Sequence, residues 1–174
     1  MKHSRTPLRY AGGKSRAYGF ISTYIPFWPK PKRIVSPFIG GGSLEVRWAN
    51  ELDIKVIGYD VFDMLVNFWK VLLKQPQELS EELSKITPDD KTYKEVKEIL
   101  MSLDKTQDML KDWKTDSYKR EDIISLSDLE RASLYYFNHN TSYGPGYLGW
   151  GSSVYLQADK WKQMCKNIQN FQCP

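Results

Sequence analysis

Short apolar runs alternate with amphipathic segments in the amino-terminal part of the chain. The runs at 32–38 and 54–59 are bounded by turn-forming residues and predict two short buried strands. Apolar residues recur at helical spacing over 63–74, and shorter helices are predicted over 14–25 and 43–52. Strands that alternate with helices are typical of a parallel, doubly wound α/β sheet.

The pattern changes after the last of these helices. Helical spacing predicts helices over 78–86, 91–103 and 126–136, with polar stretches between them. Residues 141–153 are rich in Gly and Tyr and predict a loop, and 158–171 predicts one further helix. The second part of the chain is therefore expected to be mainly helical.

Length and composition exclude several classes of protein. The 174 residues suffice for one globular domain with its own core. No run of about 18 apolar residues is present, so no membrane span is predicted. The two cysteines, Cys165 and Cys173, lack the spacing of a zinc site and cannot make a disulfide framework, and the presence of only two histidines makes a His-based metal site improbable. We expect a cytoplasmic protein without a metal.

Charge is distributed unevenly along the chain. Residues 1–50 contain nine Lys and Arg but one acid, Glu45, whereas residues 78–130 contain nine Lys and Arg against fifteen acids. A basic amino-terminal third suggests a polyanion partner such as nucleic acid. The alternative is an ordinary solvated surface, and charge alone leaves both interpretations open.

A glycine-rich turn follows the first predicted strand. Residues 36–43 read Ser-Pro-Phe-Ile-Gly-Gly-Gly-Ser, and Asp60 follows the second strand. Glycines at this place let backbone amides face a ligand, and an acid after the second strand can accept ribose hydroxyls. The dinucleotide pattern G-x-G-x-x-G is not met, because position 45 is Glu45; the turn is similar to that of S-adenosylmethionine-dependent methyltransferases. The alternative is a plain turn with Asp60 as a helix cap.

A second glycine motif, at 12–15, resembles the end of a phosphate-binding P-loop. That loop requires a further glycine at position 8, which is Leu8, and a preceding strand that the sequence does not predict. A kinase or ATPase is therefore disfavoured.

Three segments in order carry a family resemblance. They are Leu-Arg-Tyr-Ala-Gly-Gly-Lys at 8–14, Pro-Phe-Ile-Gly-Gly-Gly-Ser at 37–43, and Gly-Tyr-Asp-Val-Phe-Asp-Met-Leu-Val-Asn-Phe-Trp at 58–69. The set resembles the DNA adenine-N6 methyltransferases that carry their target-recognition region between the cofactor half and the catalytic motif. Residues 135–147 resemble the family more loosely, through an aromatic-Asn stretch before a glycine-containing loop.

The resemblance implies a Rossmann-like methyltransferase sheet, incomplete in this chain, with a mainly helical target-recognition insert. Residues 1–77 would form the S-adenosyl-L-methionine-binding half and 78–157 the target-recognition region. Residues 158–174 would return toward the catalytic domain. The implied activity is methyl transfer to N6 of a flipped adenine in double-stranded DNA, within restriction-modification in bacteria or phage.

The resemblance also assigns site residues. Six would contact S-adenosyl-L-methionine: Tyr10, Lys14, Phe38, Gly40, Gly42 and Asp60. Lys14 would lie near the carboxylate of the cofactor, and Asp60 would bind the ribose hydroxyls. Four are expected to contact DNA: Arg9, Asn140, Tyr143 and Tyr147. The alternatives are a packing role for the aromatic residues and a solvated surface position for Lys14.

The family's amine-holding motif, Asp-Pro-Pro-Tyr, is missing. The chain has no Pro-Pro pair, and residues 140–143 match only its outer letters, so we assign no catalytic residue. We expect a fragment or one subunit of the enzyme, inactive by itself. The alternatives are a non-catalytic cofactor- or DNA-binding subunit completed by a second chain, and a nucleotide-binding protein unrelated to methylation.

Overall fold

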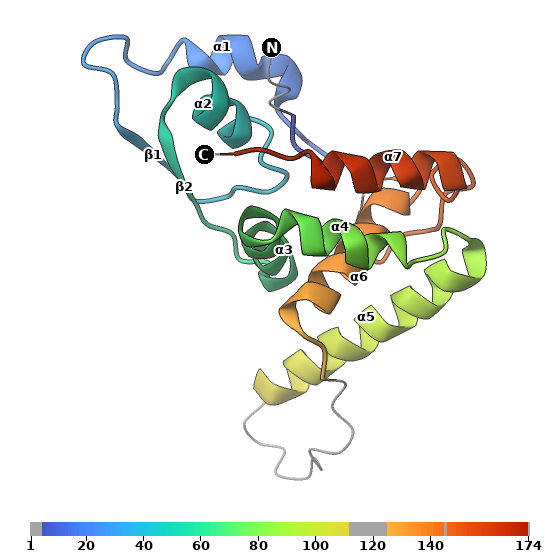
Figure 1. Ribbon diagram of the computed structural model, residues 1–174. Coiled ribbons are helices and arrows are strands. Elements are labelled where there is room, and N and C mark those ends of the chain that lie inside the picture. Colours follow the sequence, from blue (N-terminus) through green and yellow to red (C-terminus); the bar gives the residue numbers. More distant parts are fainter. Residues whose placement is uncertain (1–4, 112–124, 145, 174) are drawn as a thin grey trace.

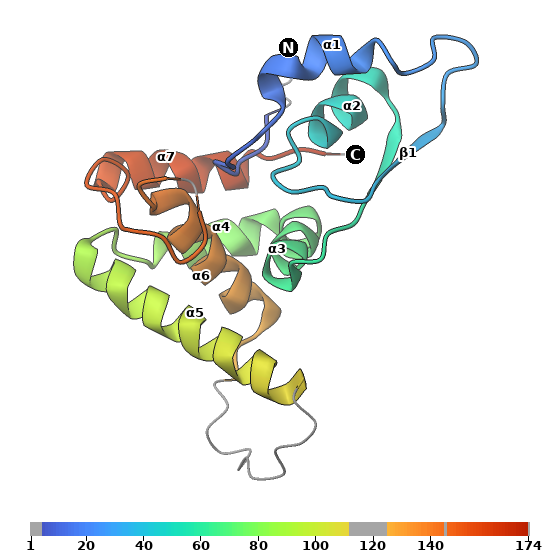
Figure 2. The ribbon, with the colours of Figure 1, turned by 180° about the vertical axis from the view of Figure 1, so that it is seen from behind.

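The computed structural model describes residues 5–111, 125–144 and 146–173, with side chains left out over 104–111. Residues 112–124, within the expected target-recognition region, lie outside the described residues. The elements follow in this order: η1 (Ser15–Ala17), α1 (Tyr18–Ser22), β1 (Arg33–Ser36), α2 (Glu45–Leu52), β2 (Lys55–Gly58), α3 (Asp63–Lys74), α4 (Pro76–Ser84), α5 (Asp90–Lys111), α6 (Asp128–Thr141) and α7 (Ala158–Gln169). The strands lie with α1 and α2 at one end of the molecule, and α3 to α7 form the other end (Figures 1 and 2).

The two strands form a parallel pair. Their register runs from Arg33 opposite Lys55 to Ser36 opposite Gly58, and α2 makes the crossover between them. A small cluster of Tyr18, Leu44 and Trp48 packs with the partly buried side chains of Ile34 and Val56. The cluster joins α1 and α2 to the strands. The expected parallel α/β arrangement is thus present, with two strands in the sheet.

The main core lies among the helices. Helix α3 buries Phe68 and Leu72, and its apolar side packs along α6. The rings of Phe68 and Tyr136 stack with centroids 5.4 Å apart. Helix α6 starts at a capping box in which Ser127 and Glu130 each accept a backbone N–H of the other. Helices α4 and α7 pack against each other and close the core.

Most predicted elements are confirmed, with shifts at their ends. The helix expected at 63–74 has those bounds, whereas the helix expected at 126–136 runs on to Thr141. The extra turn stays helical because its polar side chains are buried and hydrogen-bonded; the Thr141 hydroxyl, for example, donates to the Phe137 carbonyl at 2.6 Å. The helix expected over 14–25 is shorter and divides into η1 and α1. Within the described residues, no helix combines the length and apolar character that a membrane crossing requires.

Candidate functional site at the carboxyl ends of the strands

The loops that follow the two strands are joined by hydrogen bonds. The backbone N–H of Gly40 donates to Asp60 Oδ2 at 3.0 Å, and that of Ile39 donates to the Tyr59 carbonyl at 2.8 Å. The indole Nε1–H of Trp69, on α3, donates to the Gly40 carbonyl at 3.0 Å. The glycine turn and Asp60 therefore form one rigid unit at the carboxyl ends of β1 and β2, the edge where open α/β sheets bind ligands.

The glycines of this turn are required by their surroundings. Gly40 and Gly42 have positive φ angles of 49° and 64°. A Cβ atom at Gly42 would lie 2.6 Å from Cζ2 of Trp69, and one at Gly41 would lie 2.4 Å from Cβ of Tyr10. Both the backbone conformation and the close approach of the two aromatic side chains exclude larger residues.

The segment before α1 covers the glycine turn. Tyr10 packs over Gly40 and Gly41 and remains 36% exposed. Burial, and next the charge of Asp60, raise the pKa of Tyr10. The backbone N–H of Lys14 donates to Ser43 Oγ at 2.8 Å, and its Nζ donates to the Gly12 carbonyl at 2.6 Å. The structure thus brings most of the expected cofactor residues to one place, while Phe38 is 77% exposed.

Two of the residues expected to contact DNA, Arg9 and Asn140, hold the amino-terminal segment to α6. The guanidinium of Arg9 donates to the carbonyls of Asn140 at 2.6 Å and Ser142 at 3.2 Å, and lies 3.4 Å from the ring centroid of Tyr155. The Asn140 side chain is fully buried, accepts the Arg9 N–H at 3.0 Å and donates to the Pro7 carbonyl at 3.0 Å. Burial lowers the pKa of Arg9. A direct DNA contact by either residue stays an untested prediction, and the geometry supplies a structural role.

The glycine- and tyrosine-rich loop presents aromatic side chains to solvent. An antiparallel bridge joins Ser142 to Gly151, and the Tyr143 N–H donates to the Trp150 carbonyl at 2.7 Å. Tyr143 and Trp150 are 80% and 83% exposed. Tyr147, also expected at DNA, turns inward, where its ring packs edge-on against Phe62 with centroids 5.0 Å apart.

An aromatic cavity that the sequence analysis did not predict lies behind Tyr10. Its volume is about 280 Å³, and Ala11 and Gly146 contribute to its lining. The walls of this aromatic cavity are Tyr10, Phe62, Tyr135, His139 and Tyr147. The only sequence signal for it is the spacing of Tyr135 and His139, four residues apart on α6, which places both on one face of the helix.

His139 lies among the aromatic rings of this cavity, and burial changes its protonation. Its ring stacks between those of Tyr10 and Tyr135, with both centroid separations at 5.4 Å. Burial lowers the pKa of His139 to about 4; a hydrogen bond to the Arg9 carbonyl acts in the opposite direction, and the Arg9 charge acts in the same one. The imidazole is therefore neutral at physiological pH.

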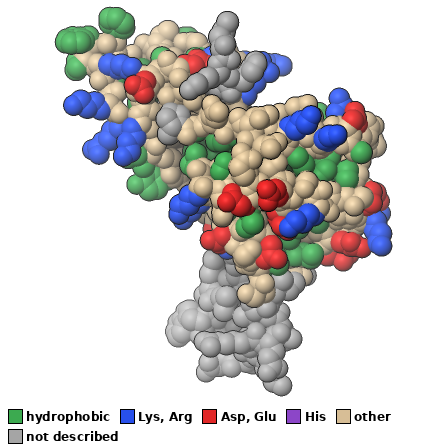
Figure 3. Space-filling view, in the orientation of Figure 1, with side chains coloured by type: hydrophobic (Ala, Val, Ile, Leu, Met, Phe, Trp, Pro, Cys, Tyr) green, Lys and Arg blue, Asp and Glu red, His purple; other side chains and the backbone are tan. Residues whose placement is uncertain are grey.

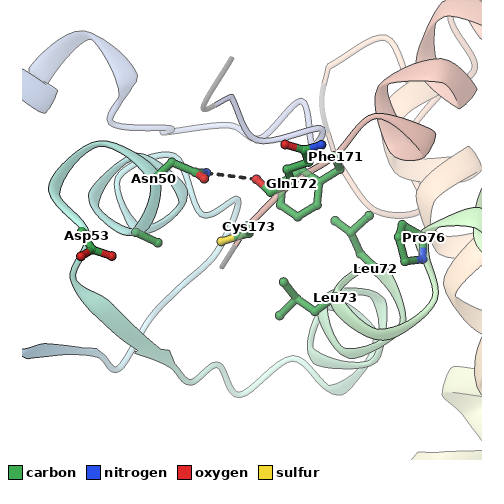
Figure 4. A pocket seen from close by; sticks show the side chains of 9 residues that line it. Asn50, Asp53, Leu72, Leu73, Pro76, Phe171, Gln172 and Cys173 are labelled. Carbon is green, nitrogen blue, oxygen red and sulfur yellow. Dashed lines mark hydrogen bonds between the residues drawn. The ribbon is translucent and has the colours of Figure 1, made fainter. Parts of the chain in front are cut away.

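A larger hollow of about 550 Å³ lies between α2, α3 and the carboxyl-terminal segment (Figure 4). Apolar side chains such as Leu72, Leu73 and Phe171 line it, and Asn50 donates to the Gln172 carbonyl at 3.1 Å across its edge. Asp53 and Gln172 also contribute to its lining. Among the described residues, no group of three His, Cys, Asp or Glu side chains is placed to hold a metal ion.

Comparison with known proteins assigns the family. The model of the D12 class N6 adenine-specific DNA methyltransferases matches residues 10–170. The chain therefore belongs to this family, and the match confirms the resemblance seen in the sequence. No curated protein matches the chain.

Proposed function

We propose that this chain binds S-adenosyl-L-methionine at the glycine turn and Asp60, and takes part in methyl transfer to N6 of adenine in double-stranded DNA. The family assignment supports DNA adenine methylation in general. The observation that carries the cofactor site is the joining of Gly40 to Asp60 at the carboxyl ends of two parallel strands. Such a place combines backbone amides with a carboxylate acceptor.

The residues present fit this cofactor. Asp60 Oδ1 accepts the Phe62 N–H at 3.1 Å, and Oδ2 accepts the Gly40 N–H. A carboxylate offers about four acceptor positions, so both oxygens retain capacity for the two ribose hydroxyls. Lys14 is exposed beside the turn, to which its backbone N–H is bonded through Ser43, and its ammonium is proposed to pair with the carboxylate of the cofactor. When bound, S-adenosyl-L-methionine supplies an electrophilic methyl group on a sulfonium centre.

The group that holds the adenine amine is proposed to come from a further polypeptide segment that carries Asp-Pro-Pro-Tyr. A Rossmann-like sheet has more strands than β1 and β2, and among the described residues apolar surface beside these two strands is left uncovered. Val35 on β1 is 55% exposed, and a hollow of about 200 Å³ beside the sheet is lined by Ile39, Val56 and Trp69. The alternative is a non-catalytic subunit that binds cofactor and DNA.

DNA contacts are proposed for two exposed regions. The α1–β1 connection carries Lys30 and Lys32 next to the strongly exposed Phe27 and Trp28. Lys, Arg and hydrophobic side chains gather on this part of the surface, whereas Asp and Glu gather over α4 and α5 (Figure 3). Positive charge with exposed rings suits phosphates and bases. The second region is the glycine- and tyrosine-rich loop, where Tyr143 is 80% exposed. Tyr143 is one of the four residues that the sequence analysis expected to contact DNA.

A labelled-methyl assay tests the proposal. The chain is incubated with S-adenosyl-L-methionine and duplex DNA, with and without a polypeptide bearing Asp-Pro-Pro-Tyr, after expression in a methylase-deficient strain. We expect Asp60-dependent cofactor binding by the chain alone and adenine methylation only in the mixture. Cofactor binding that Asp60→Ala leaves unchanged would overturn the assigned site. Binding without methylation in the mixture would favour the non-catalytic alternative.

A further inference from the structure

Two strongly exposed aromatic residues lie opposite each other on a short antiparallel hairpin. Ser142 and Gly151 form the antiparallel bridge of this hairpin. In the next pair toward the turn, the Tyr143 N–H donates to the Trp150 carbonyl at 2.7 Å. Residues directly opposed in an antiparallel pair have their side chains on the same face, so Tyr143 and Trp150 share one face of the hairpin.

The alternation of side chains directs this pair away from the core. Ser142 is fully buried, and a Cβ atom at Gly151 would lie 3.1 Å from Cδ1 of Tyr93, so these two residues face inward. Successive residues of a strand point to opposite faces. Tyr143 and Trp150 therefore point outward, in agreement with their exposed fractions of 80% and 83%.

The turn of the hairpin is held in place by two helices. The Leu148 N–H donates at 2.8 Å to Oδ1 of Asn138, a fully buried residue of α6, and Leu148 has a positive φ angle of 56°. From α5, Nζ of Lys97 donates to the Gly149 carbonyl at 3.0 Å. These contacts fix the hairpin before a ligand arrives, which lowers the ordering cost of binding.

Positive charge accompanies both strands of the hairpin. The Arg9 guanidinium donates to the Ser142 carbonyl on the first strand, and the Lys97 ammonium lies 5.6 Å from the ring centroid of Trp150 on the second. Residues 131–174 contain four Lys and Arg against one acid. Exposed rings with cations beside them suit a polyanion that carries flat groups, which describes an unpaired stretch of nucleic acid.

The hairpin also adjoins the proposed cofactor site. Tyr147, between the two exposed aromatic residues in sequence, packs against Phe62, whose N–H donates to Asp60. Tyr147 and Tyr10 line the same aromatic cavity, and Tyr10 covers the glycine turn. A base that leaves a duplex at the proposed site therefore does so next to the hairpin.

We propose that Tyr143 and Trp150 form a stacking surface for an unpaired base of DNA, whatever the identity of that base. The inference rests on the proposed function, because an enzyme that takes a base out of the duplex leaves unpaired bases behind. Aromatic side chains stack on the face that all bases have, so the surface requires neither adenine nor cofactor. It adds Trp150 to the residues that contact DNA.

Duplexes with one unpaired base test this surface directly. The purified 174-residue chain is titrated, without cofactor, with two fluorescein-labelled duplexes of one sequence, and binding is followed by anisotropy. One duplex is fully paired, and the other has an abasic site opposite thymine, cytosine, guanine or adenine in turn. We expect each opened duplex to bind at least about 10-fold more tightly than the paired one, as stacking of one base contributes about 10- to 100-fold.

Substitutions locate the preference for opened duplexes. Tyr143→Ala and Trp150→Ala are each expected to reduce it at least about 5-fold, whereas Trp150→Phe keeps a ring and should retain most of it. Both positions are exposed, so the melting temperature should stay within about 2 °C of the native value. Tyr24→Ala is the matched control, because Tyr24 is 74% exposed and lies outside the hairpin; it should leave the preference unchanged.

The contribution of charge is separated by Lys97→Gln. This variant removes the cation beside Trp150 and should weaken paired and opened duplexes by the same factor, because attraction to phosphates does not distinguish them. A loss confined to the opened duplexes would instead show that Lys97 acts by positioning the hairpin, and Trp150→Ala then still has to remove the preference for the inference to stand.

Three results overturn the inference: a preference restricted to adenine, a preference that both alanine variants retain, or no binding of DNA by the native chain. Calorimetry with S-adenosyl-L-methionine is carried out on the same proteins. Asp60-dependent cofactor binding would, in each of these cases, leave the proposed cofactor site standing. A Trp150-dependent preference without any cofactor binding would overturn the proposed function and leave the stacking surface.

Discussion

Asp60 holds Gly40 in place across the two loops that follow the strands. The Gly40 N–H lies 3.0 Å from Oδ2, and the second oxygen of the same carboxylate accepts the Phe62 N–H. One side chain thus fixes the glycine turn and the start of α3 while its remaining acceptor positions face the proposed ribose site. Asp60 is therefore expected to contribute both to folding and to binding.

Substitutions of Asp60 separate these two contributions. Asp60→Ala removes two backbone acceptors and is expected to lower the free energy of unfolding by about 1–3 kcal/mol. Loss of charge-assisted bonds to the hydroxyls should weaken S-adenosyl-L-methionine by about 10- to 1,000-fold. Asp60→Asn keeps one acceptor and should recover much of the stability but little of the affinity. Denaturant unfolding and calorimetry measure the two effects, and equal cofactor affinity in all three proteins would remove Asp60 from the site.

The glycine turn should not tolerate a side chain at Gly42. Gly42→Ala places a methyl group against Trp69 at a positive φ angle and is expected to cost about 1–3 kcal/mol of stability. Gly19 is the matched control, because a Cβ there meets no atom within 4 Å and the residue lies in α1. Gly19→Ala should be neutral or stabilising by up to about 1 kcal/mol. Thermal unfolding compares the two, and similar melting temperatures would contradict the packing described for the turn.

Replacement of Arg9 is expected to lower the stability of the fold. Its guanidinium binds the Asn140 and Ser142 carbonyls, so Arg9→Ala should lower the free energy of unfolding by about 1.5–3 kcal/mol. Arg16 is exposed, and Arg16→Ala should leave stability within about 0.5 kcal/mol of the native value. Urea unfolding distinguishes them. If the two variants have the same free energy of unfolding and Arg9→Ala alone reduces the salt dependence of DNA binding, Arg9 contacts DNA and does not stabilise the fold.

Acidification should destabilise the fold through His139. Its pKa is lowered to about 4 by burial, against about 6.5 in the unfolded chain. The unfolded state therefore binds a proton between these values while the folded state does not, and stability falls as the pH drops from about 6.5 to 4. Integrated over that interval, the loss approaches about 3 kcal/mol.

A histidine-free variant isolates this contribution. His139→Gln should show a flatter dependence of unfolding free energy on pH over the same interval, because the side chain no longer takes up a proton. The measurement is denaturant unfolding at a series of pH values from 7 to 4. Identical curves for the two proteins would show that other groups govern acid unfolding.

The sequence by itself determined the local helices and strands, and it predicted that the glycine turn and Asp60 lie close together. The helix at Asp63–Lys74 follows from apolar spacing, and the strands follow from short apolar runs bounded by turns. Because parallel strands bring their carboxyl ends to one edge, the glycine turn and Asp60 were expected together, and the Gly40–Asp60 hydrogen bond confirms that proximity.

Only the tertiary structure decided which polar residues are buried and what they bind. Asn140 and His139 lie in a segment that reads as polar, yet residues 7 to 10, about 130 positions earlier, cover them and supply their hydrogen-bond partners. Local spacing carries no information about partners so distant in the chain. The end of α6, the structural role of Arg9 and the aromatic cavity all depend on that long-range packing, which is why the sequence could not place them.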